Sequence, residues 1–230
     1  MAVSYTAMLR HDYGEPDWER IRFAGTMAIY GATIGGCAIL VNFLSRASFP
    51  EVPEHMSFVA SAFFGVVGAI AGGTLTAPIA YWGYGGLPTF AFTARPKRGP
   101  RSLLAWGAIG LAYGMVLPMM LGMLVPAAFR FLAFKNGAIN VPDLLSSFID
   151  LIIGSPFLAA MLGFQYFFTG IAAGLLFGVG AWIIDIFSSS TDASTAKYGS
   201  WVMALGLSIV VVAALVFLPE TFLARAGQLR

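Results

Sequence analysis

The chain has 230 residues, of which 58% are hydrophobic and 10% are charged, and its formal net charge at pH 7 is +2. Because soluble domains carry about 25% charged residues, this composition excludes an ordinary water-soluble protein. The small net charge gives no sign of a basic nucleic-acid-binding surface, and we expect no nucleic-acid partner.

Five stretches of the chain contain no Asp, Glu, Lys, Arg or His and are long enough to cross a bilayer as helices. They cover residues 23–44, 57–80, 102–128, 156–184 and 199–219. Inside a bilayer a segment must satisfy its own backbone groups, and these stretches lack the alternation of barrel strands. The sequence therefore predicts an all-α, polytopic integral membrane protein with five transmembrane helices.

The other segments are short. We expect an N-terminal arm over 1–22, a single helical bundle over 23–219 and a C-terminal tail over 220–230. The arm mixes acidic with basic residues, which is not the pattern of a cleavable signal or transit peptide. Cys37 is the single cysteine, so the chain has no intrachain disulfide.

Residues 143–153 predict one short amphipathic helix that lies in the membrane interface. Its apolar face carries Leu144, Leu145, Phe148, Ile149 and Ile152, and its polar face carries Asp143, Ser146, Ser147 and Asp150. Gly154, Ser155 and Pro156 predict a break, after which Pro156 opens the fourth span. A continuous tilted helix from residue 144 is the alternative.

Two further features bear on shape. Pro118 lies inside the third span and predicts a kink there. The polar stretch 185–198 is typical of an exposed loop.

All five tryptophans lie at edges of the apolar stretches, and a five-span topology puts them on one side: Trp18, Trp82, Trp106, Trp182 and Trp201. The same side holds eight Lys and Arg residues, against five on the other. The positive-inside rule then predicts a bacterial or organellar inner membrane protein with its N-terminus on the cytoplasmic or matrix side and its C-terminus opposite.

The loop before the third span is basic, with Arg95, Lys97, Arg98 and Arg101. Together with Trp82 and Trp106 on either side, it predicts binding to anionic lipid headgroups. The alternative is a topology signal that binds no specific ligand.

Glycines recur at four-residue spacing in four spans, as Gly31/Gly35, Gly68/Gly72, Gly110/Gly114 and the triple Gly170/Gly174/Gly178. Such spacing lets helix backbones approach closely in a bilayer. One interpretation is packing within the chain's own bundle. The other is docking of neighbouring subunits, for which the triple is the leading candidate.

No ionisable residue lies in the cores of the five spans, and both histidines, His11 and His55, lie outside them. This pattern argues against a proton relay, a coupling-ion site or a histidine-ligated haem. We expect no enzyme activity, no metal and no cofactor. Gln165 and Thr169, one helical turn apart, are the first candidates for a neutral-solute path.

These observations predict a non-catalytic accessory subunit of a larger inner-membrane assembly, such as an energy-transducing complex. It would act through helix packing and through contacts with lipids and other integral membrane subunits. The alternative is a small transporter or channel component for an uncharged solute.

Overall fold

The computed structural model describes residues 18–45, 58–83, 101–165, 167–190 and 194–216, which form helices and include no strand. In chain order the helices are α2 (Trp18–Ser45), α3 (Phe58–Gly83), α4 (Leu103–Lys135), α5 (Val141–Gln165), α6 (Phe167–Ser188), the short π-helical segment η1 (Thr195–Gly199) and α7 (Ser200–Val216). Five segments are long and apolar enough to cross a membrane: α2, α3, α4, α6 and the combined η1 and α7. The predicted fold class, an all-helical polytopic membrane protein, is confirmed.

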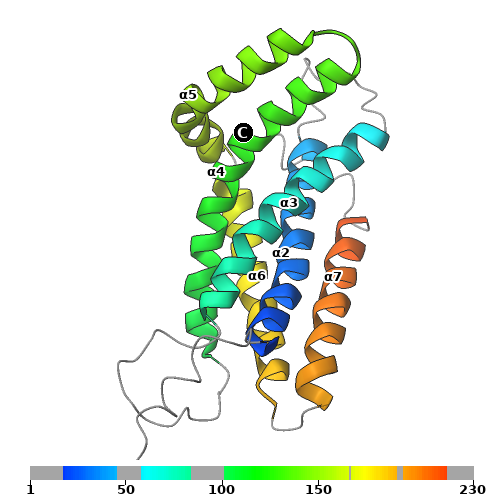
Figure 1. Cartoon of the computed structure of the whole chain (residues 1–230). Coiled ribbons are helices and arrows are strands. Elements are labelled where there is room, and N and C mark those ends of the chain that lie inside the picture. Colours follow the sequence, from blue (N-terminus) through cyan, green and yellow to red (C-terminus); the bar gives the residue numbers. More distant parts are fainter. Residues whose placement is uncertain (1–17, 46–57, 84–100, 166, 191–193, 217–230) are drawn as a thin grey trace, which may run out of the picture.

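The five spans lie side by side and alternate in direction (Figure 1). The starts of α2, α4 and α7 and the ends of α3 and α6 meet at one end of the bundle. We call this the tryptophan end, because the backbones of all five tryptophans lie in the helical turns there. The opposite end carries a helical hairpin made by the second half of α4 and the first half of α5 (Figure 1).

The fourth predicted span, residues 156–184, differs from the helices that the structure has there. The expected break at Gly154, Ser155 and Pro156 does not occur, because α5 stays helical from Val141 to Gln165. A proline removes one backbone hydrogen bond and bends a helix without having to end it. The predicted span 156–184 therefore consists of the second half of α5 and most of α6, and the amphipathic helix is longer than the predicted 143–153.

The third span is also longer than predicted. α4 continues from Leu103 to Lys135 through Pro118 and Pro126. Ser102 caps its first turn, with its hydroxyl accepting a hydrogen bond from the Ala105 amide at 3.2 Å. The helix changes direction in its second half (Figure 1), as expected for internal prolines.

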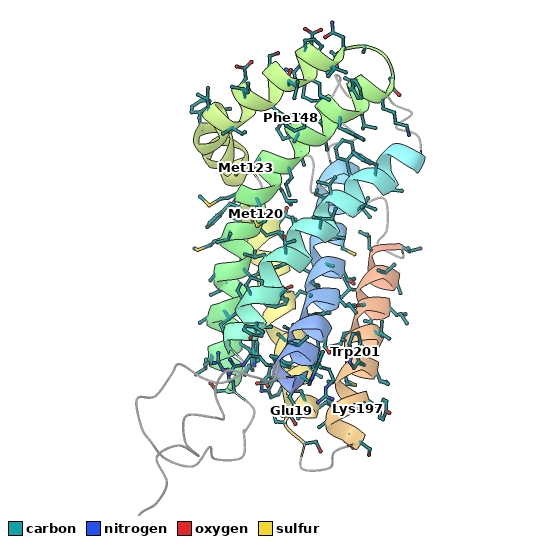
Figure 2. All side chains as sticks on the ribbon, in the orientation of Figure 1. Glu19, Met120, Met123, Phe148, Lys197 and Trp201 are labelled. Atoms are coloured by element: carbon teal, nitrogen blue, oxygen red, sulfur yellow. The ribbon has the colours of Figure 1, made fainter. Side chains whose placement is uncertain are left out.

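The predicted exposed loop over 185–198 is only partly a loop. α6 extends through Ser188, and residues 195–199 form η1 before α7 begins. Asp185 is fully buried, contrary to the prediction, because its carboxylate meets hydrogen-bond donors of α4. Figure 2 shows Lys197 and Trp201, which begin the last span, at the tryptophan end together with Glu19 of α2.

Candidate functional site

α2 and α3 pack through direct backbone contact. A Cβ atom at Gly35 would overlap the carbonyl oxygen of Gly68, and one at Gly72 would overlap the carbonyl oxygen of Gly31. Cα–H groups facing carbonyl oxygens recur at such interfaces and add weak hydrogen bonds. We call this contact the first glycine seam. It joins two antiparallel helices at a separation that only glycine allows.

α4 and α6 repeat the arrangement. A Cβ at Gly110 would overlap the carbonyl oxygen of Gly174, and one at Gly114 would overlap the carbonyl oxygen of Gly170. Gly178 extends this second glycine seam toward the tryptophan end, where a Cβ would lie 2.8 Å from the Trp106 carbonyl oxygen. The triple Gly170, Gly174 and Gly178 is therefore occupied by α4 of the same chain and is not free to dock a neighbouring subunit, which corrects the second interpretation of this motif.

The two seams make two similar antiparallel helix pairs, α2 with α3 and α4 with α6, that start at the same end of the bundle. The sequence gives no convincing internal repeat. The likeness appears when the helices are paired, because the two halves share few features: the glycine spacing, and a tyrosine before a seam glycine at Tyr30–Gly31 and at Tyr113–Gly114.

Tyrosine hydroxyls tie the two pairs together in the middle of the bundle. The Tyr30 hydroxyl of α2 donates to the Leu176 carbonyl of α6 at 2.9 Å, and the Tyr113 hydroxyl of α4 donates to the Gly31 carbonyl of α2 at 3.0 Å. Phe177 stacks on both rings, with centroid distances of 6.0 Å to Tyr30 and 4.5 Å to Tyr113. Because a peptide carbonyl does not take up a proton readily, these bonds join helices and are unsuited to relaying protons.

Glycine also makes room for these rings. A Cβ at Gly180 would overlap the Tyr30 ring, and a Cβ at Gly72 would lie 3.0 Å from the Tyr113 hydroxyl. Sequence reasoning missed Tyr30, Tyr113 and Phe177, because an aromatic residue in a span has no signature that separates a central position from a lipid-facing one. The available signal was that each tyrosine directly precedes a glycine of a four-residue repeat, Tyr30 before Gly31 and Tyr113 before Gly114, and so lies close to a packed helix face.

Four threonine hydroxyls within the spans bond to carbonyls of their own helices. Thr26, Thr74 and Thr76 donate to carbonyls three or four residues earlier, at 2.7–3.2 Å. Thr33 lies 3.0 Å from both the Ile29 carbonyl and the Ser208 hydroxyl of α7. A hydroxyl has one proton, so Ser208 donates to Thr33 whenever Thr33 donates to Ile29.

The predicted solute-path pair is described only in part. Thr169 is half-buried on α6, and Gln165 ends α5 with its side chain outside the described residues. Four other threonines, Thr26, Thr33, Thr74 and Thr76, bond to carbonyls of their own helices, which is the usual behaviour of such residues in membrane helices.

Asp185 forms a polar junction at the tryptophan end. Its carboxylate is 0% exposed, and its Oδ2 atom accepts hydrogen bonds from the Arg101 amide and the Trp106 indole, each at 2.8 Å. Arg101 precedes α4, and Trp106 lies in its first turn. The N-terminus of a helix carries a partial positive charge, which favours a carboxylate there. The last turn of α6 is therefore fastened to the first turn of α4.

This junction corrects the assignment of Trp106 to the lipid headgroups. Trp106 is 1% exposed and its indole N–H is satisfied inside the protein, with Phe23 of α2 at a ring distance of 6.3 Å. Arg101 is half-buried, and it contributes its main-chain amide to the junction. The other members of the predicted headgroup site, Arg95, Lys97 and Arg98 and the Trp82 side chain, lie outside the described residues.

Sequence reasoning also missed Asp185 as a site residue, since it directly follows an apolar stretch and resembles the start of a loop.

Within the described residues, no three His, Cys, Asp or Glu side chains gather closely enough to hold a metal ion. Comparisons of the chain with models of protein families, with curated proteins and with solved structures found no match.

Proposed function

We propose that the protein is a non-catalytic accessory subunit of a larger inner-membrane assembly, such as an energy-transducing complex. The observation that carries the proposal is the closed interior: two glycine seams bring backbones into contact, and tyrosine hydroxyls tie the two helix pairs together. An interior filled in this way suits a rigid body that positions its neighbours.

The outward side chains also favour this function. Large apolar residues on α3, α4, α6 and α7 are exposed, including Val66, Met115, Leu175 and Leu205. Such surfaces fit lipid tails and the helices of other integral membrane subunits alike. In this proposal the basic loop retains anionic lipid on the cytoplasmic or matrix side, where the N-terminus lies.

The alternative, transport of an uncharged solute, needs polar groups that face a path. The hydroxyls of Thr26, Thr74 and Thr76 bond to helix carbonyls instead, which favours the scaffold function.

Native mass spectrometry of membrane fragments tests the proposal. We expect the 24.4 kDa chain in an assembly of fixed stoichiometry with other integral membrane subunits. A chain that is monodisperse and alone after mild extraction would contradict it. Solute flux into liposomes that is specific and is abolished by Gln165→Leu would contradict it in favour of transport.

A further inference from the structure

The hairpin lies at the end of the bundle opposite the tryptophans, where Ala128 and Leu132 of its α4 half still pack on the bundle core. α4 has 33 residues, which corresponds to a length of about 50 Å. A bilayer has a hydrocarbon core of roughly 30 Å. The α4–α5 hairpin, residues 126–153, therefore has to lie at or beyond the boundary of that core, where α4 has bent away from the axis of the other spans (Figure 1).

One side of this hairpin is apolar and uncovered. In the first half of α5, Val141, Leu145, Ile149 and Ile152 are 53–72% exposed, and they fall within about 80° of one another around the helix. We call these four residues the α5 ridge. Leu144 and Phe148 are half-buried, and Phe148 lies between α5 and α4 in Figure 2. The ridge therefore lies beside the face of α5 that packs on α4 and is separate from that face.

The polar residues of α5 lie on another side. Asp143, Ser146 and Asp150 are exposed, and their directions around the helix are roughly opposite to the ridge. A helix with this division lies flat at a membrane surface, with its apolar face among the acyl chains and its polar face toward water.

Exposed apolar side chains also occur between the ridge and the next membrane span. Beyond it along α5, Ile153, Phe157 and Met161 are also exposed, and the exposed Phe168 follows at the start of α6, a membrane span. Acyl chains that surround the span are the simplest cover for these exposed side chains.

The charges of the hairpin say which lipids it fits. Arg130 and Lys135 on α4 are exposed, as are Asp143 and Asp150 on α5. Two positive and two negative charges give the hairpin no net charge, so it has no electrostatic preference for anionic headgroups. Its attachment has to come from the apolar side chains.

We propose that the α4–α5 hairpin is half-immersed in the leaflet opposite the tryptophan end, with the α5 ridge in the acyl chains of uncharged as well as anionic lipids. The hairpin then holds the second half of α4 at the membrane surface. The proposal does not depend on the accessory-subunit function, because it concerns lipid contact by this chain alone.

Spin labels in the full chain test it. Ile149→Cys and Asp150→Cys are made separately in a Cys37→Ala background, and the labelled proteins are reconstituted into phosphatidylcholine vesicles. Leu205→Cys on the exposed side of α7 is the acyl-chain reference. The measured quantity is the ratio of collisions with oxygen, which enters lipid, to collisions with a nickel chelate, which stays in water.

We expect the ratio at residue 149 to resemble that at residue 205 and to exceed that at residue 150 several-fold, with no change in high salt. All three positions are exposed, so the labels leave the fold intact, which elution from a sizing column checks. A label at 149 that the nickel chelate reaches as readily as 150 would overturn the proposal. A label at 149 shielded from both reagents would also overturn it, because another protein segment would then cover the ridge.

Discussion

The second glycine seam and the contact between α2 and α7 both join two spans, but by different means. In the seam, the backbones of α4 and α6 touch at Gly110, Gly114, Gly170 and Gly174, and the ring of Pro118 packs on Gly170. α7 instead meets α2 through the Thr33–Ser208 hydroxyl pair, while Val202, Leu205, Ile209 and Val210 remain exposed. Gly206 of α7 has open space around it.

The comparison shows that a glycine in a membrane helix contributes to packing only where the backbone of another helix contacts it. Lipid tails are as apolar as leucine, so helices gain little by hiding apolar side chains from them, and close packing decides which helices stay together. The seams are therefore expected to be intolerant of added volume, whereas α7 should tolerate it. Four experiments test how the helices are joined, and the largest effect is expected in the seam.

Gly174→Val should destabilise the protein most. The added side chain would overlap the Gly110 carbonyl and lie about 2.9 Å from the Gly114 Cα at its first atom. Backbone on the opposing helix cannot give way, so we expect a loss near the upper range for overpacking, about 3 kcal/mol. Unfolding in detergent micelles measures it, with Gly206→Val as the matched control in open space. Equal stability of the two variants would remove the distinction between the seam and α7.

Asp185→Ala should have the next largest effect. It leaves the buried Trp106 indole N–H and the part-buried Arg101 amide without this acceptor. A buried unsatisfied group costs roughly 1–3 kcal/mol and a part-buried one costs less, so we expect a total loss of about 2 kcal/mol. Asp185→Asn keeps an acceptor oxygen and should lose less. Asp150→Ala, an exposed acid on α5, is the control and should stay within about 0.5 kcal/mol of the parent. The junction would have no structural role if Asp185→Ala behaved like this control.

Tyr113→Phe removes the hydrogen bond to the Gly31 carbonyl and keeps the ring on Phe177. We expect a loss of about 1 kcal/mol in the free energy of unfolding, the usual net value of one hydrogen bond. The exposed Tyr198, changed to Phe, provides the comparison and should show no loss. A neutral Tyr113→Phe would mean that this hydrogen bond does not help to join the two helix pairs.

The Thr33–Ser208 pair should have the smallest effect. Thr33 keeps the Ile29 carbonyl as a partner when Ser208 is replaced, and hydrogen bonds between membrane helices average about 0.6 kcal/mol. A double-mutant cycle of Thr33→Val and Ser208→Ala should give a coupling energy of that order. A coupling energy larger than the loss caused by Tyr113→Phe would mean that α7, and not the centre of the bundle, carries the strongest hydrogen bond between helices.

Much of the architecture is predictable because the bilayer restricts the choices. The five apolar stretches identify the five spans, and the amphipathic division of residues 143–153 identifies a separate helix before the last two. Helix ends are harder to predict. Pro156 resembles a helix start in the sequence, but α5 runs through it. The sequence does not separate the two cases, because a proline-bent helix and two consecutive helices have nearly the same local pattern.

The candidate site was less accessible to prediction. The glycines of both seams were found from their spacing, whereas their partners were not, because spacing does not say which helix faces which. Trp106 was assigned to the headgroup layer on the general preference of indole, and the structure gives its N–H to Asp185 instead. That bond joins residues 79 positions apart.

The sequence by itself determined that this chain crosses a membrane as helices and, apart from the start of the fourth span, about where the spans lie, because apolar length and backbone hydrogen bonding leave no other solution in lipid. Only the tertiary structure decided that the glycines face one another in two pairs, that Tyr30 and Tyr113 bridge those pairs, and that Asp185 is buried. These outcomes depend on the rotation of each helix about its axis, which is set by close packing with its neighbours.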